Sequence, residues 1–175
     1  MRKTNRVYKM ILSALFLALA YVMPFLTGQI QQFGAMLCPM HIPVLLCGFF
    51  CGGYWGAAVG FIAPLFRSFT LGMPALFPNA VCMALELAAY GAVAGVMHRV
   101  LPRKKPYIYV SLLTAMLVGR LVWGAAMFLC MSARGGFGLA AFLSGALFNA
   151  IPGIVVQIVL IPLLVMLLDK PPMGD

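Results

Sequence analysis

Six apolar stretches, separated by short polar or glycine- and proline-rich breaks, follow one another along the whole chain. They cover residues 8–25, 36–52, 54–69, 77–97, 107–131 and 139–168. Most are close to the roughly 20 residues that an α-helix needs to cross the hydrocarbon core of a bilayer. The pattern predicts an all-α membrane protein with six transmembrane helices in a single domain, residues 1–175. The limits of the two short stretches, 36–52 and 54–69, are the least distinct.

The basic residues give these helices an orientation. Nine of the twelve Lys and Arg residues lie within residues 2–9, within residues 99–105 or at position 170. Basic clusters beside membrane spans stay on the cytoplasmic side. Six crossings put both termini and the 99–105 loop on that side, so the N- and C-termini are expected to be cytoplasmic. The other three basic residues are Arg67, Arg120 and Arg134.

Composition supports the membrane assignment. The chain is 64% hydrophobic and 9% charged, with a mean hydropathy of +1.05, whereas a soluble domain carries about 25% charged residues. A net charge of +9 would suggest nucleic acid in a soluble protein. Here the charges flank the spans, so the expected partner is the lipid bilayer and not nucleic acid. The basic N-terminus could begin a signal peptide, but residues 23–29 lack a clear cleavage site, and the first helix is expected to be retained.

Two ionisable residues lie well inside predicted spans. Glu86 is about nine residues from the outer end of its helix and Arg120 about eleven from the outer end of the next. A charge near the middle of a spanning helix costs at least about 2.5–3.5 kcal/mol, so the two groups are expected either to pair or to face a wet cavity. One interpretation is a structural ion pair between the helices, and the other is a polar ligand site.

Further polar groups gather at the same depth or above it, which favours the ligand site. Arginine guanidiniums suit carboxylates or phosphates, and an indole offers a stacking surface. His41, at the start of the second helix, is either an interfacial or capping residue or a ligand contact. The deeper Gln157 is interpreted as an amide that packs between helices. The candidate substrate-binding residues are Asn79, Glu86, Arg120, Trp123, Arg134 and Asn149, with His41 and Arg67 near the rim.

Several functions lack their signatures. The sequence has no Walker A motif, no HExxH and no convincing Ser/His/Asp set. An enzyme and a primary pump acting alone are therefore not expected. The five cysteines include no CxxC motif and no paired His spacing, so neither a metal nor a cofactor is expected.

Small residues recur at four-residue spacing, which lets helix backbones approach closely. Packing within the protein explains most of these pairs, whereas Ala14 and Ala18 could instead contact a partner protein. The spaced small residues are Ala14 and Ala18, then Gly52, Gly56 and Gly60, then Gly91 and Gly95.

The chain resembles the substrate-binding S-components of energy-coupling factor (ECF) vitamin transporters over essentially its full length. Residues 14–18 (ALFLA) are similar to the small-xxx-small face with which that family meets its coupling subunit. Residues 39–46 (PMHIPVLL) look like the start of the family's second helix. The number of helices and the cytoplasmic termini also match. This resemblance implies a bacterial cell-membrane protein that binds one vitamin in an outward-facing pocket, formed by helices 4–6 with residues 27–38 and 132–138. It further implies docking on a transmembrane coupling subunit driven by two ATPases.

The substrate is less well specified than the family. The Met40-His41-Ile42-Pro43 start looks most like S-components assigned to pantothenate, and a carboxylate would suit Arg120 or Arg134. Glu86 in the same pocket would disfavour a dianion, so pyridoxine-type, pyrimidine-type, riboflavin and queuosine-precursor ligands stay open. Two other functions are also considered: a membrane scaffold or assembly protein with a structural Glu86–Arg120 pair, and an autonomous small secondary carrier.

Overall fold

The computed structural model describes residues 6–26, 39–102, 105–132 and 151–168, and the regular structure in these residues is all helical. The predicted all-α class is confirmed. Three helices within the described residues are long and apolar enough to cross a membrane, and two shorter ones are also apolar. The elements are α1 (Arg6–Leu26), α3 (His41–Cys51), α4 (Gly53–Leu71), the π-helical turn η1 (Leu76–Ala80), α5 (Val81–Val100), α6 (Lys105–Ser132) and α8 (Ile151–Leu168).

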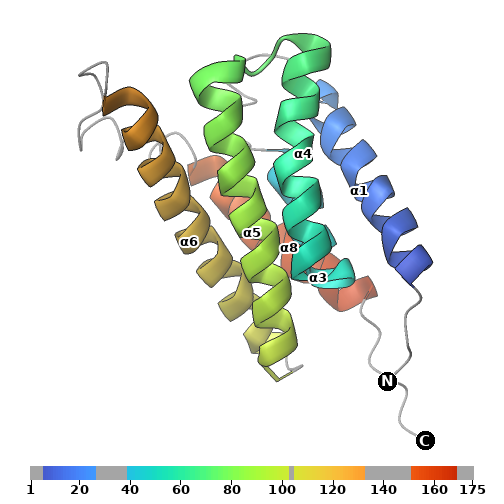
Figure 1. Ribbon diagram of the computed structural model, residues 1–175. Coiled ribbons are helices and arrows are strands. Elements are labelled where there is room, and N and C mark those ends of the chain that lie inside the picture. Colours follow the sequence, from blue (N-terminus) through green and yellow to red (C-terminus); the bar gives the residue numbers. More distant parts are fainter. Residues whose placement is uncertain (1–5, 27–38, 103–104, 133–150, 169–175) are drawn as a thin grey trace, which may run out of the picture.

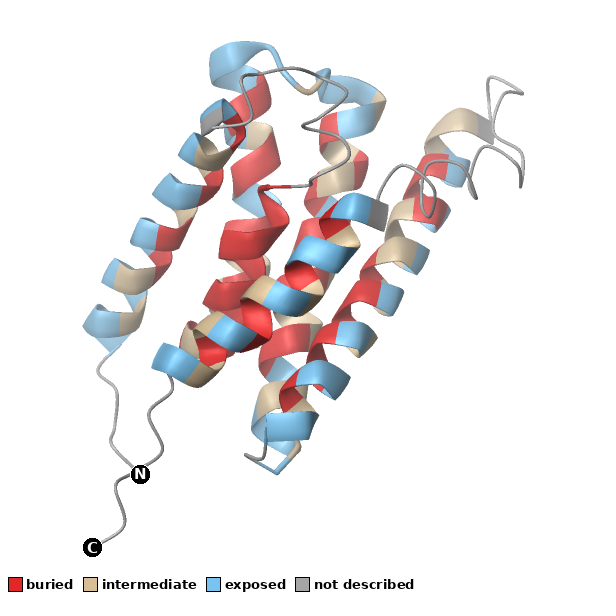
Figure 2. Ribbon diagram, turned by 180° about the vertical axis from the view of Figure 1, so that it is seen from behind, coloured by how far each residue is buried: buried red, intermediate tan, exposed pale blue. Residues whose placement is uncertain are grey.

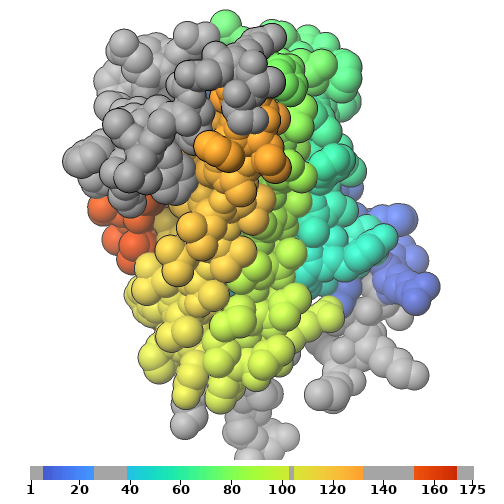
Figure 3. Space-filling model, turned by 60° about the vertical axis from the view of Figure 1, so that its left-hand side comes forward, coloured from blue at the N-terminus to red at the C-terminus, as the bar shows by residue number. Residues whose placement is uncertain are grey.

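The helices form a bundle in which α4 and α5 stand side by side, with α1 beyond α4 and α6 beyond α5 (Figure 1). The helix α8 crosses obliquely behind them and packs against α3 and α6. Seen from its α6 side, the bundle shows α6 lying along α5 (Figure 3). The beginning of α1, the α3–α4 turn and the α5–α6 turn lie toward one end of the bundle, which we call the basic end because it carries Arg6, Lys9, Arg99 and Lys105.

Many of the residues exposed on the outward faces of the bundle (Figure 2) are large and apolar. On α6 the exposed positions include Leu113, Leu117, Leu121 and Phe128, and α1 exposes a similar row of aliphatic residues. Soluble monomers rarely expose contiguous apolar areas of this extent. Such a surface suits contact with lipid, as the composition predicts.

The short helix α3 occupies the middle of the bundle, packed against α1, α4, α5 and α8. All of its residues are buried except Phe50. At 11 residues it is about 16 Å long, half the thickness of a bilayer core. Its first residue, His41, therefore lies inside the bundle and not at its surface.

Glycine backbones bring α3, α4 and α5 into direct contact. A Cβ atom added to Gly56 would lie 2.7 Å from both the Cα of Gly48 and the carbonyl oxygen of Gly91. One added to Gly48 would lie 2.6 Å from that same Gly91 oxygen. The small residues predicted to allow close helix approach on the third and fourth helices therefore pack inside the protein, as expected.

Several predicted limits differ from the structure. The second helix is described from His41, the later limit of its expected start, after a turn at Pro39 and Met40; residues 36–38 lie outside the described part of the chain. The fourth helix is α-helical only from Val81, since Phe77 has extended backbone angles within the preceding π-helical turn. The last helix is described from Ile151, and residues 139–150 lie outside the described part.

Candidate functional site

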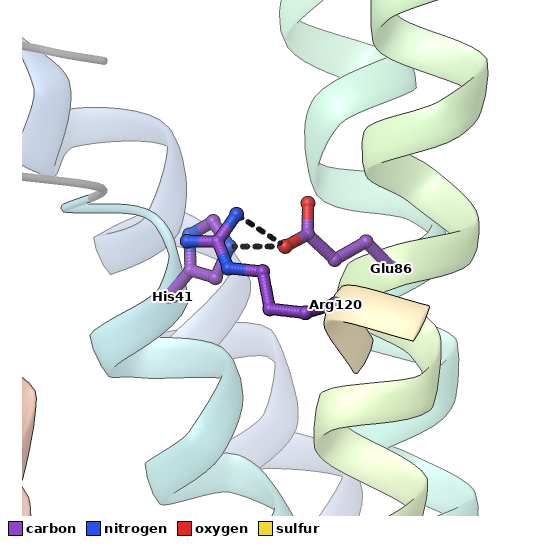
Figure 4. Close-up of polar contacts among 3 residues, drawn as sticks. All are labelled: His41, Glu86 and Arg120. Carbon is purple, nitrogen blue, oxygen red and sulfur yellow. Dashed lines mark ion pairs between the residues drawn. The ribbon is translucent and has the colours of Figure 1, made fainter. Parts of the chain in front are cut away.

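A buried ion pair joins α5 to α6 in the interior of the bundle (Figure 4). The Nη1 atom of Arg120 lies 2.9 Å from Oε1 of Glu86. Glu86 is 14 residues from Val100 and Arg120 is 15 residues from Lys105, so both lie about 21–23 Å from the α5–α6 turn at 1.5 Å per residue. The expectation that the two groups share one depth and could pair directly agrees with this contact.

His41 brings a third helix to the same carboxylate. Its Nε2 atom lies 3.6 Å from Oε1 of Glu86, and the side chains of both residues are 2% exposed. Because His41 is the first residue of α3, the N-terminal end of that helix approaches the carboxylate. The positive end of a helix dipole attracts negative charge, so α3 and Arg120 both bring positive charge to the Glu86 carboxylate.

The three side chains differ in accessibility, which decides how a ligand could reach them. Glu86 and His41 are enclosed, whereas Arg120 keeps 16% of its side chain exposed. With a neutral imidazole, the charges of Glu86 and Arg120 cancel, so the cluster as a whole is neutral. Arg120 is therefore the member of the cluster that a hydrogen-bond acceptor could approach while Glu86 remains in place.

Tyr90 completes the wall of this cluster, and the sequence analysis did not identify it. Its ring lies edge-on to the imidazole of His41, with 5.0 Å between ring centroids. Tyr90 follows Glu86 by four residues, so the two share one face of α5. The four-residue spacing from Glu86 could have indicated Tyr90, but a tyrosine in an apolar helix is also typical of an ordinary core residue.

Two of the predicted residues lie apart from the cluster. The guanidinium of Arg67 donates a hydrogen bond from Nη1 to the carbonyl oxygen of Tyr21, at 3.0 Å, and lies over the ring of Phe25. Both partners belong to α1, so Arg67 ties α4 to α1. Asn79 is exposed in η1. It precedes Glu86 by seven residues, but because the α-helix begins only at Val81, Asn79 does not continue the helical face of Glu86.

The remaining candidates divide between described and undescribed parts of the chain. Trp123 is half-buried and packs with Cys82 and Met127, between α5 and α6. Gln157 is buried in α8, and within the described residues its Oε1 atom has no hydrogen-bond partner. Arg134 and Asn149 lie outside the described residues.

Replacing Arg67 with alanine should lower the free energy of unfolding by about 1–3 kcal/mol, because a hydrogen bond from a charged donor is lost. The described residues around it include no acidic partner that the change would leave unpaired. The thermal unfolding of purified Arg67→Ala protein in detergent checks this expectation, with Thr70→Ala, an exposed site on the same helix, as the control. Equal unfolding temperatures for Arg67→Ala and the unchanged protein would contradict a role in joining α1 to α4.

Comparison with known proteins identifies the family to which this architecture belongs. The chain has no match among curated proteins or among solved structures. It matches one protein family, described as ECF transporter, substrate-specific component, over residues 8–165. The match runs from within α1 to within α8 and includes the helices that carry His41, Glu86 and Arg120. This family is a transporter component and not an enzyme family, in agreement with the absence of catalytic motifs. The chain therefore belongs to the family of substrate-specific components of ECF transporters.

Proposed function

We propose that this protein binds a vitamin-like small molecule beside the Glu86–Arg120 pair and delivers it through a transmembrane coupling subunit driven by two ATPases. The observation that carries the proposal is the buried ion pair at 2.9 Å with His41 alongside. A buried ion pair often stabilises a protein no more than apolar residues of the same volume would, because removing both charges from water is unfavourable. Ionisable groups in membrane helices commonly mark substrate sites instead.

The proposed topology has six crossings of the bacterial cell membrane, with both termini in the cytoplasm. Four described basic residues, Arg6, Lys9, Arg99 and Lys105, lie at the basic end of the bundle. The helix start at Arg6 and the α5–α6 turn are also at that end. This distribution supports a cytoplasmic basic end and a substrate site that opens toward the opposite, outer end.

The charge of the cluster limits the ligands that it would accept. Because Glu86 already neutralises Arg120, a neutral, zwitterionic or singly charged ligand fits better than a dianion. Pantothenate, with one carboxylate, two hydroxyl groups and one amide, is our first choice; its carboxylate would contact the accessible part of Arg120. We propose that Trp123, Arg134 and Asn149 line the same outward-facing pocket, with Asn79, which is exposed, at its outer rim.

The decisive experiment is mass spectrometry of the small molecule that co-purifies with the protein. We expect one vitamin-like compound in near-stoichiometric amount, retained without ATP. Isothermal titration of ligand-free protein with pantothenate then tests the specific choice. A different bound solute would replace pantothenate and leave the proposed site intact, whereas protein free of any solute, and unable to bind candidate vitamins, would contradict the site.

The other two functions make different predictions. The direct contact between Glu86 and Arg120 also suits a membrane scaffold, which would bind no ligand with high affinity. An autonomous carrier would move solute across liposomes that contain this chain alone. We expect no such flux without the coupling subunit and the ATPases.

The exposed face of α1 is the proposed surface for the coupling subunit. Ala14 and Ala18 are both exposed and one turn apart, so they form a shallow strip on which another helix could pack closely. Changing both to tryptophan should reduce ATP-dependent solute uptake at least about tenfold and leave solute binding unchanged, because the strip is remote from Arg120. Uptake into cells that express the complete transporter measures the first effect.

The matched control for this double change is Ala125→Trp, at an exposed position of α6 on the other side of the bundle. It should preserve both uptake and binding. Normal uptake by the Ala14→Trp/Ala18→Trp protein would show that the coupling subunit docks elsewhere.

A further inference from the structure

Two cysteines from different helices meet near the end of the α5–α6 pair that is remote from the connecting turn. Cys82 lies in the first turn of α5 and Cys130 in the last turn of α6, and their Sγ atoms are 3.8 Å apart. Cys82 is completely buried, whereas Cys130 is partly exposed and lies two residues from the end of its helix. A small reagent can therefore reach one thiol of the pair directly and the other only through it.

Apolar side chains pack around the pair of cysteines. Cys82 packs in one cluster with Ala126 and Met127, and the side chains of Trp123, Cys130 and Met131 pack against that cluster. A disulfide has an S–S distance of about 2.05 Å, so the sulfurs would have to approach by roughly 1.8 Å from their separation of 3.8 Å. Rotation of the two side chains about their Cα–Cβ bonds is the movement that could close this gap.

The other pair of cysteines in the described residues differs in accessibility. Cys47 and Cys51 lie one turn apart on α3 in the middle of the bundle, and both are buried. The thiol of Cys47 contacts the hydroxyl of Ser13, with 3.6 Å between Sγ and Oγ. Since neither thiol is accessible, this pair offers no point of attack and serves as an internal control.

We propose that Cys130 and Cys82 form a thiol–disulfide exchange site for low-molecular-weight disulfides, such as oxidised glutathione. The thiolate of Cys130 attacks one sulfur of the small disulfide, forms a mixed disulfide and releases one thiol. The thiolate of Cys82 then attacks Sγ of Cys130 and releases the second thiol. The small disulfide is reduced by two electrons, the two cysteines are oxidised, and their two protons leave with the released thiols.

This cross-link would join α5 to α6 one helical turn from Glu86, since Cys82 precedes Glu86 by four residues. It would therefore fix the spacing of the helices that hold the Glu86–Arg120 pair. The side of the membrane at which exchange occurs rests on the proposed function, which places this end of the bundle outside the cell. The chemistry of the pair does not depend on that proposal.

The experiment treats the full-length protein in detergent with oxidised glutathione, alkylates the remaining thiols with iodoacetamide and maps the peptides by mass spectrometry. The expected product is a Cys82–Cys130 disulfide, with Cys47 and Cys51 alkylated only after unfolding. Accumulation of a stable glutathione adduct on Cys130 in the unchanged protein would overturn the proposal. So would full alkylation of both thiols after the treatment.

Two variants separate the roles of the thiols. Cys82→Ala should stop at the mixed disulfide on Cys130, and Cys130→Ala should leave Cys82 unreactive in the folded protein. A Cys82–glutathione adduct in Cys130→Ala would contradict the assigned order of attack. If a variant does not fold, the unchanged protein alone still decides whether the disulfide forms.

Treating intact cells from outside with oxidised glutathione tests on which side of the membrane the exchange occurs. We expect the disulfide to form there too, because the proposed topology exposes this end. Formation in detergent but not in cells would contradict that topology and leave the exchange site standing.

Discussion

Replacing Arg120 with alanine should abolish high-affinity solute binding and lower the free energy of unfolding by about 3–5 kcal/mol. The second effect follows because Glu86, 2% exposed, would lose the partner at 2.9 Å from its Oε1 atom. Removing one member of a buried pair leaves an uncompensated charge in a low-dielectric interior. Thermal unfolding in detergent and titration with the co-purifying solute measure the two effects on one preparation.

A second substitution separates the two effects. In the Glu86→Gln/Arg120→Ala protein no charge is left unpaired, so most of the lost stability should return. Solute binding should not return, because the guanidinium that we propose contacts the ligand is still missing. Recovery of both stability and binding in the double variant would assign the pair a purely structural role and would favour the scaffold function.

Arg67→Ala is the matched control, because it removes a buried arginine that lies outside the candidate site. Its guanidinium contacts α1, so its loss should reduce stability without weakening solute binding. Loss of binding in this variant, at a temperature at which it is folded, would show that the ligand site extends to α1.

The contact between Glu86 and Arg120 could be predicted because helices convert sequence into depth in a regular way. Each residue lies 14 or 15 positions from the same turn, and each is an ionisable group in an apolar helix. Counting residues from that turn is then enough to place the two at one level. The high energy of an isolated charge in that setting supplies the reason for pairing.

Other features could not be predicted, because they depend on backbone geometry or on ordinary side chains. Arg67 is bound by the carbonyl oxygen of Tyr21, and every residue carries such an acceptor. Asn79 would share the face of Glu86 only in an uninterrupted α-helix, and the sequence does not mark the π-helical turn η1 that precedes α5.

Replacing Gly56 with valine should prevent the bundle from assembling, and Gly56→Ala should lower the free energy of unfolding by about 1–3 kcal/mol or more. Overpacking a close contact typically has an effect of that size. The Cβ atom of alanine at this position would lie 2.7 Å from both the Cα of Gly48 and the carbonyl oxygen of Gly91. Both are backbone atoms of neighbouring helices, so neither can be displaced by a side-chain rotation.

The same contact positions the candidate site, which gives the prediction a second measurable consequence. Gly48 is on α3 with His41, and Gly91 is on α5 next to Tyr90 and one turn beyond Leu87. Forcing α4 away from these helices should separate His41 from Glu86 and weaken solute binding in any Gly56→Ala protein that folds. Ala125→Val, at an exposed position of α6, adds the same kind of bulk without a close neighbour and should leave unfolding temperature and binding unchanged. Unchanged stability in Gly56→Ala would instead mean that the backbones of α3, α4 and α5 are not in close contact at Gly56. The close packing that we infer to position His41 beside Glu86 would then be absent.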